Sequence, residues 1–287
     1  MKSIALWIII FREKQILYGK AMKPEINDIC ILARQAGQIL ADGVGKIHQV
    51  TQKGIQDPVT EIDKMSEEFI LERLSAMYPG HSVLSEESGL HTGDPEHVWY
   101  IDPLDGTMNY AHGVPYFCVS IAYADKNTLS MGVIYDPMRD ECFYAEKGKG
   151  AFCNGRPVRV SKEIKMSNAL MATGFSMKLI EMGRDNFSVF KHFMLRTAGV
   201  RRMGSAALEI AYTADGRLDA MWEMQMSAWD VAAGFVIAQE AAAIITDLQG
   251  DPDCFKPPYE YLISNSTLHP MMLAEMKTAI NESRLVK

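Results

Sequence analysis

Apolar residues recur at helical spacing in the first element that the pattern predicts. They follow Pro24 at intervals of mostly three and four positions, at Ile26, Ile29, Leu32, Ala33, Ala36, Ile39 and Leu40. This period predicts an amphipathic helix that ends at Gly43. A loop over residues 53–63 then leads into a second predicted helix, which runs from Asp63 to about Tyr78.

Short apolar runs bounded by turn residues predict strands in the middle of the chain. The run over 98–101 stops at Asp102-Pro103, and residues 81–85 form a shorter strand before two acids. Runs over 116–124, 129–135 and 142–145, with polar turns between them, predict an antiparallel meander. Asn154-Gly155 is typical of a hairpin turn, so we interpret the glycines of 148–155 as structural.

After residue 165 the pattern changes to alternating strands and helices. It predicts strands over 169–173, 218–223, 243–247 and 261–264, and helices over 186–196, about 206–216, 230–240 and 268–280. The chain therefore divides into an N-terminal α+β half, residues 23–165, and a C-terminal α/β half, residues 166–287. Residues 1–22 form an extension before both.

Composition excludes some classes of protein. The chain has 287 residues, 48% of them hydrophobic, which suits a globular protein with a full core. Its net charge of −7 and the lack of a Lys/Arg run argue against nucleic acid as the main ligand. The five cysteines form no CxxC pair, so we expect reduced thiols in a reducing compartment.

The extension contains an eight-residue apolar run, residues 4–11, between Lys2 and Arg12. A bilayer-spanning helix needs about 20 such residues, so no stable membrane anchoring is expected. No small-residue cleavage site of a signal peptide follows the run. We predict a cytoplasmic protein, with weak membrane association as the alternative.

Five acids stand at the starts or ends of predicted elements, with no His or Cys beside them in the sequence. They are Asp63, Glu86, Asp102, Asp105 and Asp230. Oxygen-only donor sets suit hard cations such as Mg²⁺, and converging carboxylates repel one another unless a cation lies between them. The alternative interpretation is structural, because Asp63 and Asp230 also suit helix starts and Asp102 suits a turn.

The run Asp102-Pro103-Leu104-Asp105-Gly106-Thr107 resembles the D-P-[IL]-D-G-T signature of the inositol monophosphatase family. Three other motifs of that family are similar to segments here, in the same order along residues 24–280. They are D-x-V-T-x-x-D at 57–63, E-E-S at 86–88 and W-D-x-A at 229–232. The resemblance implies a layered αβαβα sandwich (α/β, or α+β) of the inositol monophosphatase and fructose-1,6-bisphosphatase type, and a homodimer.

The resemblance also implies a set of metal ligands for two or three Mg²⁺ ions, with Li⁺ as an inhibitor. One ion would be held by Glu86, Asp102 and the carbonyl of Leu104, and a second by Asp102, Asp105 and Asp230. A third, weaker ion would lie near Asp63 and Glu86. Among these ligands, Glu86 and Asp63 would also act in catalysis.

Further roles are implied for the water and the substrate. Thr107, with Asp63, would help to activate the attacking water, and the amides of Gly106 and Thr107 would bind the phosphate. The group near the hydroxyls of the substrate would comprise Asp105, the backbone of Ala206, Glu223 and Asp230.

The function that follows is a Mg²⁺-dependent phosphomonoesterase, an inositol-phosphate phosphatase that hydrolyses inositol-1-phosphate, a small-molecule phosphate ester. One alternative is a fructose-1,6-bisphosphatase or a sugar phosphatase of dual specificity. An alternative from another class is a regulatory binding protein that has a phosphatase-like fold.

Overall fold

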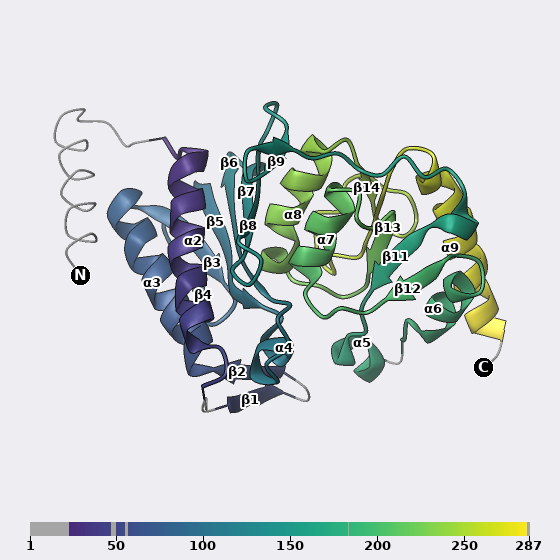
Figure 1. Cartoon of the computed structure of the whole chain (residues 1–287), viewed down its shortest axis with the longest axis horizontal. Coiled ribbons are helices and arrows are strands. Elements are labelled where there is room, and N and C mark those ends of the chain that lie inside the picture. Colours follow the sequence, from purple (N-terminus) through teal and green to yellow (C-terminus); the bar gives the residue numbers. More distant parts are fainter. Residues whose placement is uncertain (1–22, 47–49, 55–56, 183, 286–287) are drawn as a thin grey trace.

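The structure, a computed structural model, describes residues 23–46, 50–54, 57–182 and 184–285. Two sheets and three helical layers alternate across the molecule (Figure 1). One outer layer holds α2 (Ile26–Gly43) and α3 (Glu61–Met77), and the middle layer holds α7 (Ala206–Ala214) and α8 (Ala228–Glu240). Helices α6 (Phe187–Met194) and α9 (Leu268–Leu285) form the other outer layer. The layered αβαβα sandwich predicted from the resemblance is confirmed. The predicted extension, residues 1–22, lies outside the described residues.

The first outer layer forms as the apolar period predicts. Helix α2 spans Ile26–Gly43 and α3 spans Glu61–Met77, and the side chains that recur along α2 are buried against the sheet. Gly37 allows the closest approach, because a Cβ there would stand 2.4 Å from the ring of Tyr135. A two-stranded sheet of β1 (Val50–Gly54) and β2 (Asp57–Thr60) joins the helices, where the sequence predicted a loop.

The larger sheet has eight strands in the order β10-β9-β8-β7-β6-β5-β3-β4. Strands β6, β7 and β8 form the predicted antiparallel meander, and β5 extends it by pairing antiparallel with β6. Strand β3 pairs with β5 in parallel. The bounds are His81–Ser85 for β3, Gly89–His91 for β4, Asp94–Asp105 for β5, Cys118–Asp125 for β6, Thr128–Asp136 for β7, Glu141–Glu146 for β8, Ala151–Cys153 for β9 and Arg156–Pro157 for β10. Helix α4 (Thr107–Ala111) follows β5.

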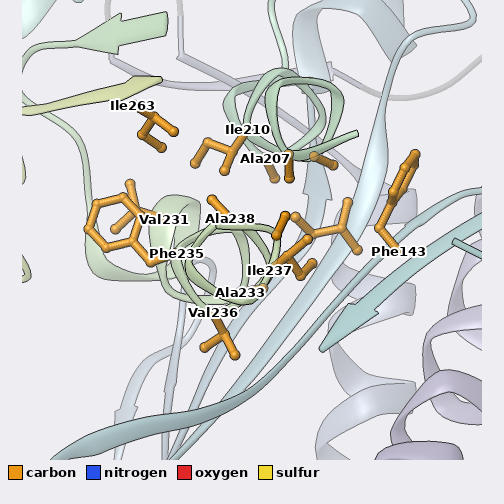
Figure 2. Close-up of a cluster of buried hydrophobic side chains, with 14 of the residues drawn as sticks. Phe143, Ala207, Ile210, Val231, Ala233, Phe235, Val236, Ile237, Ala238 and Ile263 are labelled. Atoms are coloured by element: carbon orange, nitrogen blue, oxygen red, sulfur yellow. The ribbon is translucent and has the colours of Figure 1, made fainter. Parts of the chain in front are cut away.

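The middle layer is the most apolar part of the fold. Helix α7 spans Ala206–Ala214 and α8 spans Ala228–Glu240, and α8 is buried on nearly all sides, as a helix enclosed between two sheets must be. Side chains of both helices form a cluster of buried hydrophobic residues, and Figure 2 shows Ile210 of α7 and Phe235 of α8 within it. Gly132 lets β7 lie directly against α8, because a Cβ there would stand 2.3 Å from the carbonyl oxygen of Ala233.

The second sheet has five strands in the order β12-β11-β13-β15-β14. Strands β11, β12 and β13 run parallel, and β15 is antiparallel to both of its neighbours. Helices α6 and α9 cover its outer face around Trp222. The bounds are Leu170–Thr173 for β11, Gly199–Arg201 for β12, Ala220–Glu223 for β13, Ile244–Thr246 for β14, Tyr261–Ser264 for β15, Phe187–Met194 for α6 and Leu268–Leu285 for α9.

Several boundaries differ from the sequence predictions. Strand β5 continues to Asp105 instead of stopping at Asp102-Pro103, because its pairing with β6 resumes after an irregularity between those two acids. The short elements β4, β12 and α5 (Met177–Glu181) and the 3₁₀ turn Met166–Asn168 were not predicted. The hairpin at Asn154-Gly155 is confirmed, with both residues at positive φ.

No helix within the described ranges is both long and apolar enough to cross a bilayer. The cytoplasmic location and the division into halves at residue 165 stay predictions.

Candidate active site

Asp63 occupies the third position of α3, where it completes a capping box. The hydroxyl of Thr60 accepts hydrogen bonds from the amides of Ile62 and Asp63, and the amide of Thr60 donates to Asp63 Oδ2 at 2.8 Å. The N-cap is therefore Thr60. The other carboxylate oxygen, Oδ1, accepts a hydrogen bond from Thr107 at 3.1 Å. The structural and the functional interpretations of Asp63 thus use different oxygens of one side chain.

Asp102 lies at the irregular end of β5, where the strand leaves regular pairing. Its side chain is 2% exposed, and Oδ1 accepts a hydrogen bond from the amide of Leu104 at 3.0 Å. The carbonyl oxygen of Leu104 accepts a hydrogen bond from Thr107 Oγ1 at 3.0 Å. Because of this irregularity, the carboxylate of Asp102 and the carbonyl of Leu104 lie in the same region as Thr107.

Asp105 joins the end of β5 to the start of α7. Its Oδ2 accepts hydrogen bonds from Ser205 Oγ at 2.6 Å and from the amide of Ala207 at 2.8 Å. Ser205 is the N-cap of α7 and accepts a hydrogen bond from the amide of Leu208. Burial raises the pKa of Asp105, and these donors act in the opposite direction. A carboxylate at a helix start is favoured there by the helix dipole.

Glu86 follows β3 directly, and α3 fixes the turn that carries it. The amide of Glu86 donates to the carbonyl of Ile101 at 3.1 Å. Glu67 Oε1 of α3 accepts hydrogen bonds from the amides of Glu87 and Ser88, each at 3.1 Å. Glu67 was not predicted, because its two partners lie about 20 residues further along the chain and become neighbours only in the fold.

Asp230 repeats at α8 the arrangement of Asp63 at α3. It is the third residue of the helix and closes a capping box with Ser227, whose amide donates to Asp230 Oδ2 at 2.8 Å. The alternative interpretation, in which Asp230 is the N-cap, is therefore wrong in its position: Ser227 is the N-cap, and Asp230 stabilises the first turn from within the helix. The neighbouring Trp229 is tied to the larger sheet through its carbonyl, which accepts a hydrogen bond from Ser120 Oγ at 3.5 Å.

Gly106 and Thr107 form the turn between β5 and α4. Gly106 has φ of +96°, a conformation that favours glycine, and a Cβ there would stand 3.0 Å from the carbonyl oxygen of Tyr116. Asn109, in the next turn, donates to the carbonyls of Tyr116 and Met203 at 2.8 Å each. The Asn109 contacts hold this turn against the segment before α7 and were not predicted.

The acids interact through space. Burial raises the pKa of Asp102 well above its ordinary value, and the charges of Glu86, Asp105 and Asp230 raise it further. These four oxygen donors, with no His or Cys, are the ligand types that Mg²⁺ prefers, and a divalent cation would relieve their repulsion. Among the described residues, no three Asp, Glu, His or Cys side chains already converge as ligands of one ion.

A cavity of about 190 Å³ opens beside these acids. Its lining brings together the predicted substrate residues Asp105, Ala206 and Glu223. Glu223 is the last residue of β13. Burial raises the pKa of Glu223 well above its ordinary value, and the charge of Glu209 adds to the shift. Gly174 leaves room for this carboxyl, because a Cβ there would stand 2.6 Å from Glu223 Oε1.

Glu209 of α7 also lines this cavity and was not predicted. It is 2% exposed, and its Oε1 accepts hydrogen bonds from the amides of Met203 and Gly204 at 2.8 and 3.1 Å. Burial raises its pKa to about 8. The contacts of Glu209 shape the turn that leads to Ser205. Its position within an otherwise apolar stretch of helix was the one signal in the sequence.

The fold and these acids define an α/β protein of the type shared by inositol monophosphatases and fructose-1,6-bisphosphatases. Residues 23–281 match the model of the inositol monophosphatase family, and the chain belongs to that family.

Known relatives carry two kinds of name. The Nus factor SuhB of Pseudomonas aeruginosa is 41% identical over 236 residues, which cover 80% of this chain and 87% of that protein. The inositol-1-monophosphatase of Mesorhizobium japonicum is 40% identical over 235 residues, covering 79% and 87%. The solved structure of inositol monophosphatase from Anabaena (Nostoc) sp. has a TM-score of 0.80 and 38% identity, covering 88% of this chain and 95% of that one.

Proposed function

We propose that this chain is a Mg²⁺-dependent phosphomonoesterase that hydrolyses inositol-1-phosphate. The observation that carries the proposal is a set of four carboxyl groups in which three act electrostatically on Asp102 and one, Asp105, lines the cavity together with Glu223. The four are Glu86, Asp102, Asp105 and Asp230. The relatives named inositol monophosphatase support the same assignment.

These residues suit two or three Mg²⁺ ions. Glu86, Asp102 and the carbonyl of Leu104 would hold one, Asp102, Asp105 and Asp230 a second, and Asp63 with Glu86 a weaker third. When bound, Mg²⁺ supplies positive charge for the phosphoryl oxygens and lowers the pKa of a bound water.

Thr107 and Asp63 handle the proton of the attacking water in this proposal. The Thr107 hydroxyl is 3.1 Å from Asp63 Oδ1, so a water that donates to Thr107 can pass its proton towards that carboxylate. The amides of Thr60, Ile62 and Asp63 belong to the capping box, which keeps Asp63 in place during the transfer.

In this proposal the phosphate and the leaving group would both contact residues next to Asp105. The amides of Gly106 and Thr107 would bind phosphate oxygens at the start of α4. Glu223 would accept hydrogen bonds from hydroxyls of the polyol, next to Asp105, Asp230 and the backbone of Ala206. The Ala206 amide also interacts with Asp105, so one turn of chain organises both ligand and substrate.

The test is release of phosphate from inositol-1-phosphate and from fructose-1,6-bisphosphate, with and without Mg²⁺, by wild type and Asp102→Asn. We expect Mg²⁺-dependent turnover that Asp102→Asn abolishes, with Li⁺ as an inhibitor. The matched control is Asp253→Asn, since Asp253 is an exposed acid of the 251–256 loop, whose side chain is 78% exposed. Normal turnover by Asp102→Asn would refute the mechanism. A strong preference for fructose-1,6-bisphosphate would replace the substrate with that of the bisphosphatase alternative.

The relatives named Nus factor SuhB favour one second candidate, a regulatory protein that binds a transcription complex through its phosphatase-like fold. Asp102→Asn separates the two candidates, because the substitution removes catalysis without changing the outer surface. Binding of purified RNA polymerase by both forms, with no turnover by the wild type, would favour the regulatory candidate. The cytoplasmic location and the homodimer belong to both candidates, and gel filtration with light scattering tests the dimer.

A further inference from the structure

Two cysteines face each other across the contact between α2 and the larger sheet. Cys142 lies on β8, is 1% exposed, and belongs to the same buried cluster against which Cys30 of α2 packs. The remaining three cysteines, Cys118, Cys153 and Cys254, belong to the other large cluster, on the far side of the sheet. All five are free thiols in this structure.

The positions of neighbouring residues place the two thiols together independently. In the pairing of β7 with β8, Cys142 lies directly opposite Tyr135. One helical turn after Cys30, Arg34 lies over the ring of Tyr135, 5.0 Å from its centroid, and forms an ion pair with Asp140. Arg34 thus ties α2 to a residue two positions before Cys142, and Cys30, one turn earlier on the same helix, is close enough for the two thiols to form a hydrogen bond.

The helix also lies unusually close to the sheet here. Two turns after Cys30, a Cβ at Gly37 would stand 2.4 Å from the Tyr135 ring, so the backbone of α2 rests directly on that ring. A disulfide needs Cα atoms about 4.4–6.8 Å apart, which ordinary packing of a helix on a sheet does not allow. Cα atoms of α2 lie within 8 Å of Cα atoms of β8 at several positions, which is close to that range.

We propose that Cys30 and Cys142 are a peroxide-responsive thiol pair that forms an intramolecular disulfide and fastens α2 to β8. Hydrogen peroxide is the two-electron oxidant. The Cys30 thiolate attacks one peroxide oxygen, the O–O bond breaks, and water leaves with the thiol proton, giving the sulfenic acid. The Cys142 sulfur then displaces the hydroxyl as a second water, so two thiols and one peroxide yield one disulfide and two waters.

The order of the two steps follows from exposure and acidity. Cys30 is half-buried and is the member that a peroxide can reach, whereas Cys142 is buried. The hydrogen bond to Cys30 and burial raise the pKa of Cys142 above its ordinary range, so Cys142 is the poorer nucleophile towards peroxide. Its proton passes to the departing hydroxyl of the sulfenic acid as its sulfur forms the disulfide. The crosslink would close a loop of roughly 110 residues, which restricts the unfolded chain strongly.

The experiment treats the purified full chain with hydrogen peroxide, removes the oxidant with catalase, denatures the protein and alkylates all free thiols before intact-mass measurement. We expect alkylation to fall from five thiols to three, and a protease digest to contain a peptide pair joined through Cys30 and Cys142. Dithiothreitol should restore five alkylated thiols, and the oxidised form should unfold at a higher urea concentration than the reduced form.

Three variants make the result specific. Cys30→Ser and Cys142→Ser should each lose the crosslink, whereas Cys153→Ser, on the neighbouring strand β9, should keep it. Five alkylated thiols after peroxide would overturn the proposal. So would a crosslink between two chains, or a Cys30 that proceeds to the sulfinic acid while Cys142 remains alkylated. None of these readouts depends on phosphatase activity, so the proposed function and this proposal can fail separately.

Discussion

Replacing Ser205 with alanine removes two interactions of one hydroxyl, and each has its own readout. Ser205 Oγ donates to Asp105 Oδ2 at 2.6 Å and accepts from the amide of Leu208 at 3.4 Å as the N-cap of α7. Loss of a cap costs about 1 kcal/mol, and a hydrogen bond to a charged group contributes about 1.5–3 kcal/mol. Because the amide of Ala207 continues to donate to the same oxygen of Asp105, we expect the two losses together to lie near the lower end of their combined range.

The expected loss in the free energy of unfolding is therefore about 2–3 kcal/mol for Ser205→Ala. Urea unfolding without Mg²⁺ measures it. The second readout is the Mg²⁺ concentration for half-maximal activity, which should rise about tenfold or more, as is typical when a residue that orients a metal ligand is lost. Ser205→Thr keeps the hydroxyl and should retain most of both properties.

Both roles of Ser205 are refuted if Ser205→Ala unfolds at the same urea concentration as wild type and is activated by the same Mg²⁺ concentration. A loss of stability without any change in Mg²⁺ activation would support the capping role of Ser205 but contradict its role in orienting Asp105 for a metal.

Three further predictions concern other parts of the fold. Gly132→Ala should destabilise the protein by about 1–3 kcal/mol in urea unfolding, because its Cβ would meet the backbone of Ala233. Glu67→Ala should raise the Mg²⁺ requirement about tenfold in the activity assay, whereas Glu67→Gln keeps an acceptor oxygen and most of the affinity. Burial lowers the pKa of His269 to about 4 in the folded state, below the ordinary 6.5 of the unfolded state. Between pH 6.5 and 4 the unfolded state therefore binds more protons than the folded state, and the free energy of unfolding falls as the pH is lowered. Urea unfolding at pH 7 and 5 should show a loss of at most about 2 kcal/mol that His269→Gln lacks.

The pH prediction has a structural cause that the sequence does not reveal. Thr246 donates its hydroxyl proton to the carbonyl of Asp247 at 2.7 Å, so it accepts from His269 Nε2 at 3.0 Å. Ser264 then donates to His269 Nδ1 at 3.0 Å, which a protonated ring would no longer accept. An imidazole at 3% exposure held in this way is stable only in its neutral form.

The sequence predicted the long elements and the positions of the acids well, because both depend on local patterns. The period along α2 and the run before Asp102 are properties of neighbouring residues. The strands β1, β4 and β12 were not predicted, because each is held by pairing with a partner and not by its own composition. The predicted end of β5 was wrong for a similar reason. Asp-Pro usually ends a strand, but pairing with β6 resumes at Asp105.

Residues that position the acids escaped prediction for the same physical reason. Ser66 donates to the carbonyl of Pro103 at 2.9 Å, and Glu67 and Asn109 bind backbone groups that are distant in sequence. Glu209 binds amides of the turn that precedes its own helix. Polar residues of these types are common on helix surfaces, and only the packed fold shows that these four face inwards. The roles of the acids themselves as ligands stay predictions that the Mg²⁺ experiments test.

The two capping boxes have a consequence for how such sequences are interpreted. Asp63 and Asp230 each give one oxygen to the first turn of a helix, and this use of the carboxylate persists whether or not the chain turns over any substrate. A relative that had lost catalysis and kept only a binding role would still lose helix stability if it replaced either acid. The presence of these two aspartates in a sequence is therefore weak evidence of activity, whereas Asp102, whose burial among other acids is costly without a cation, is informative.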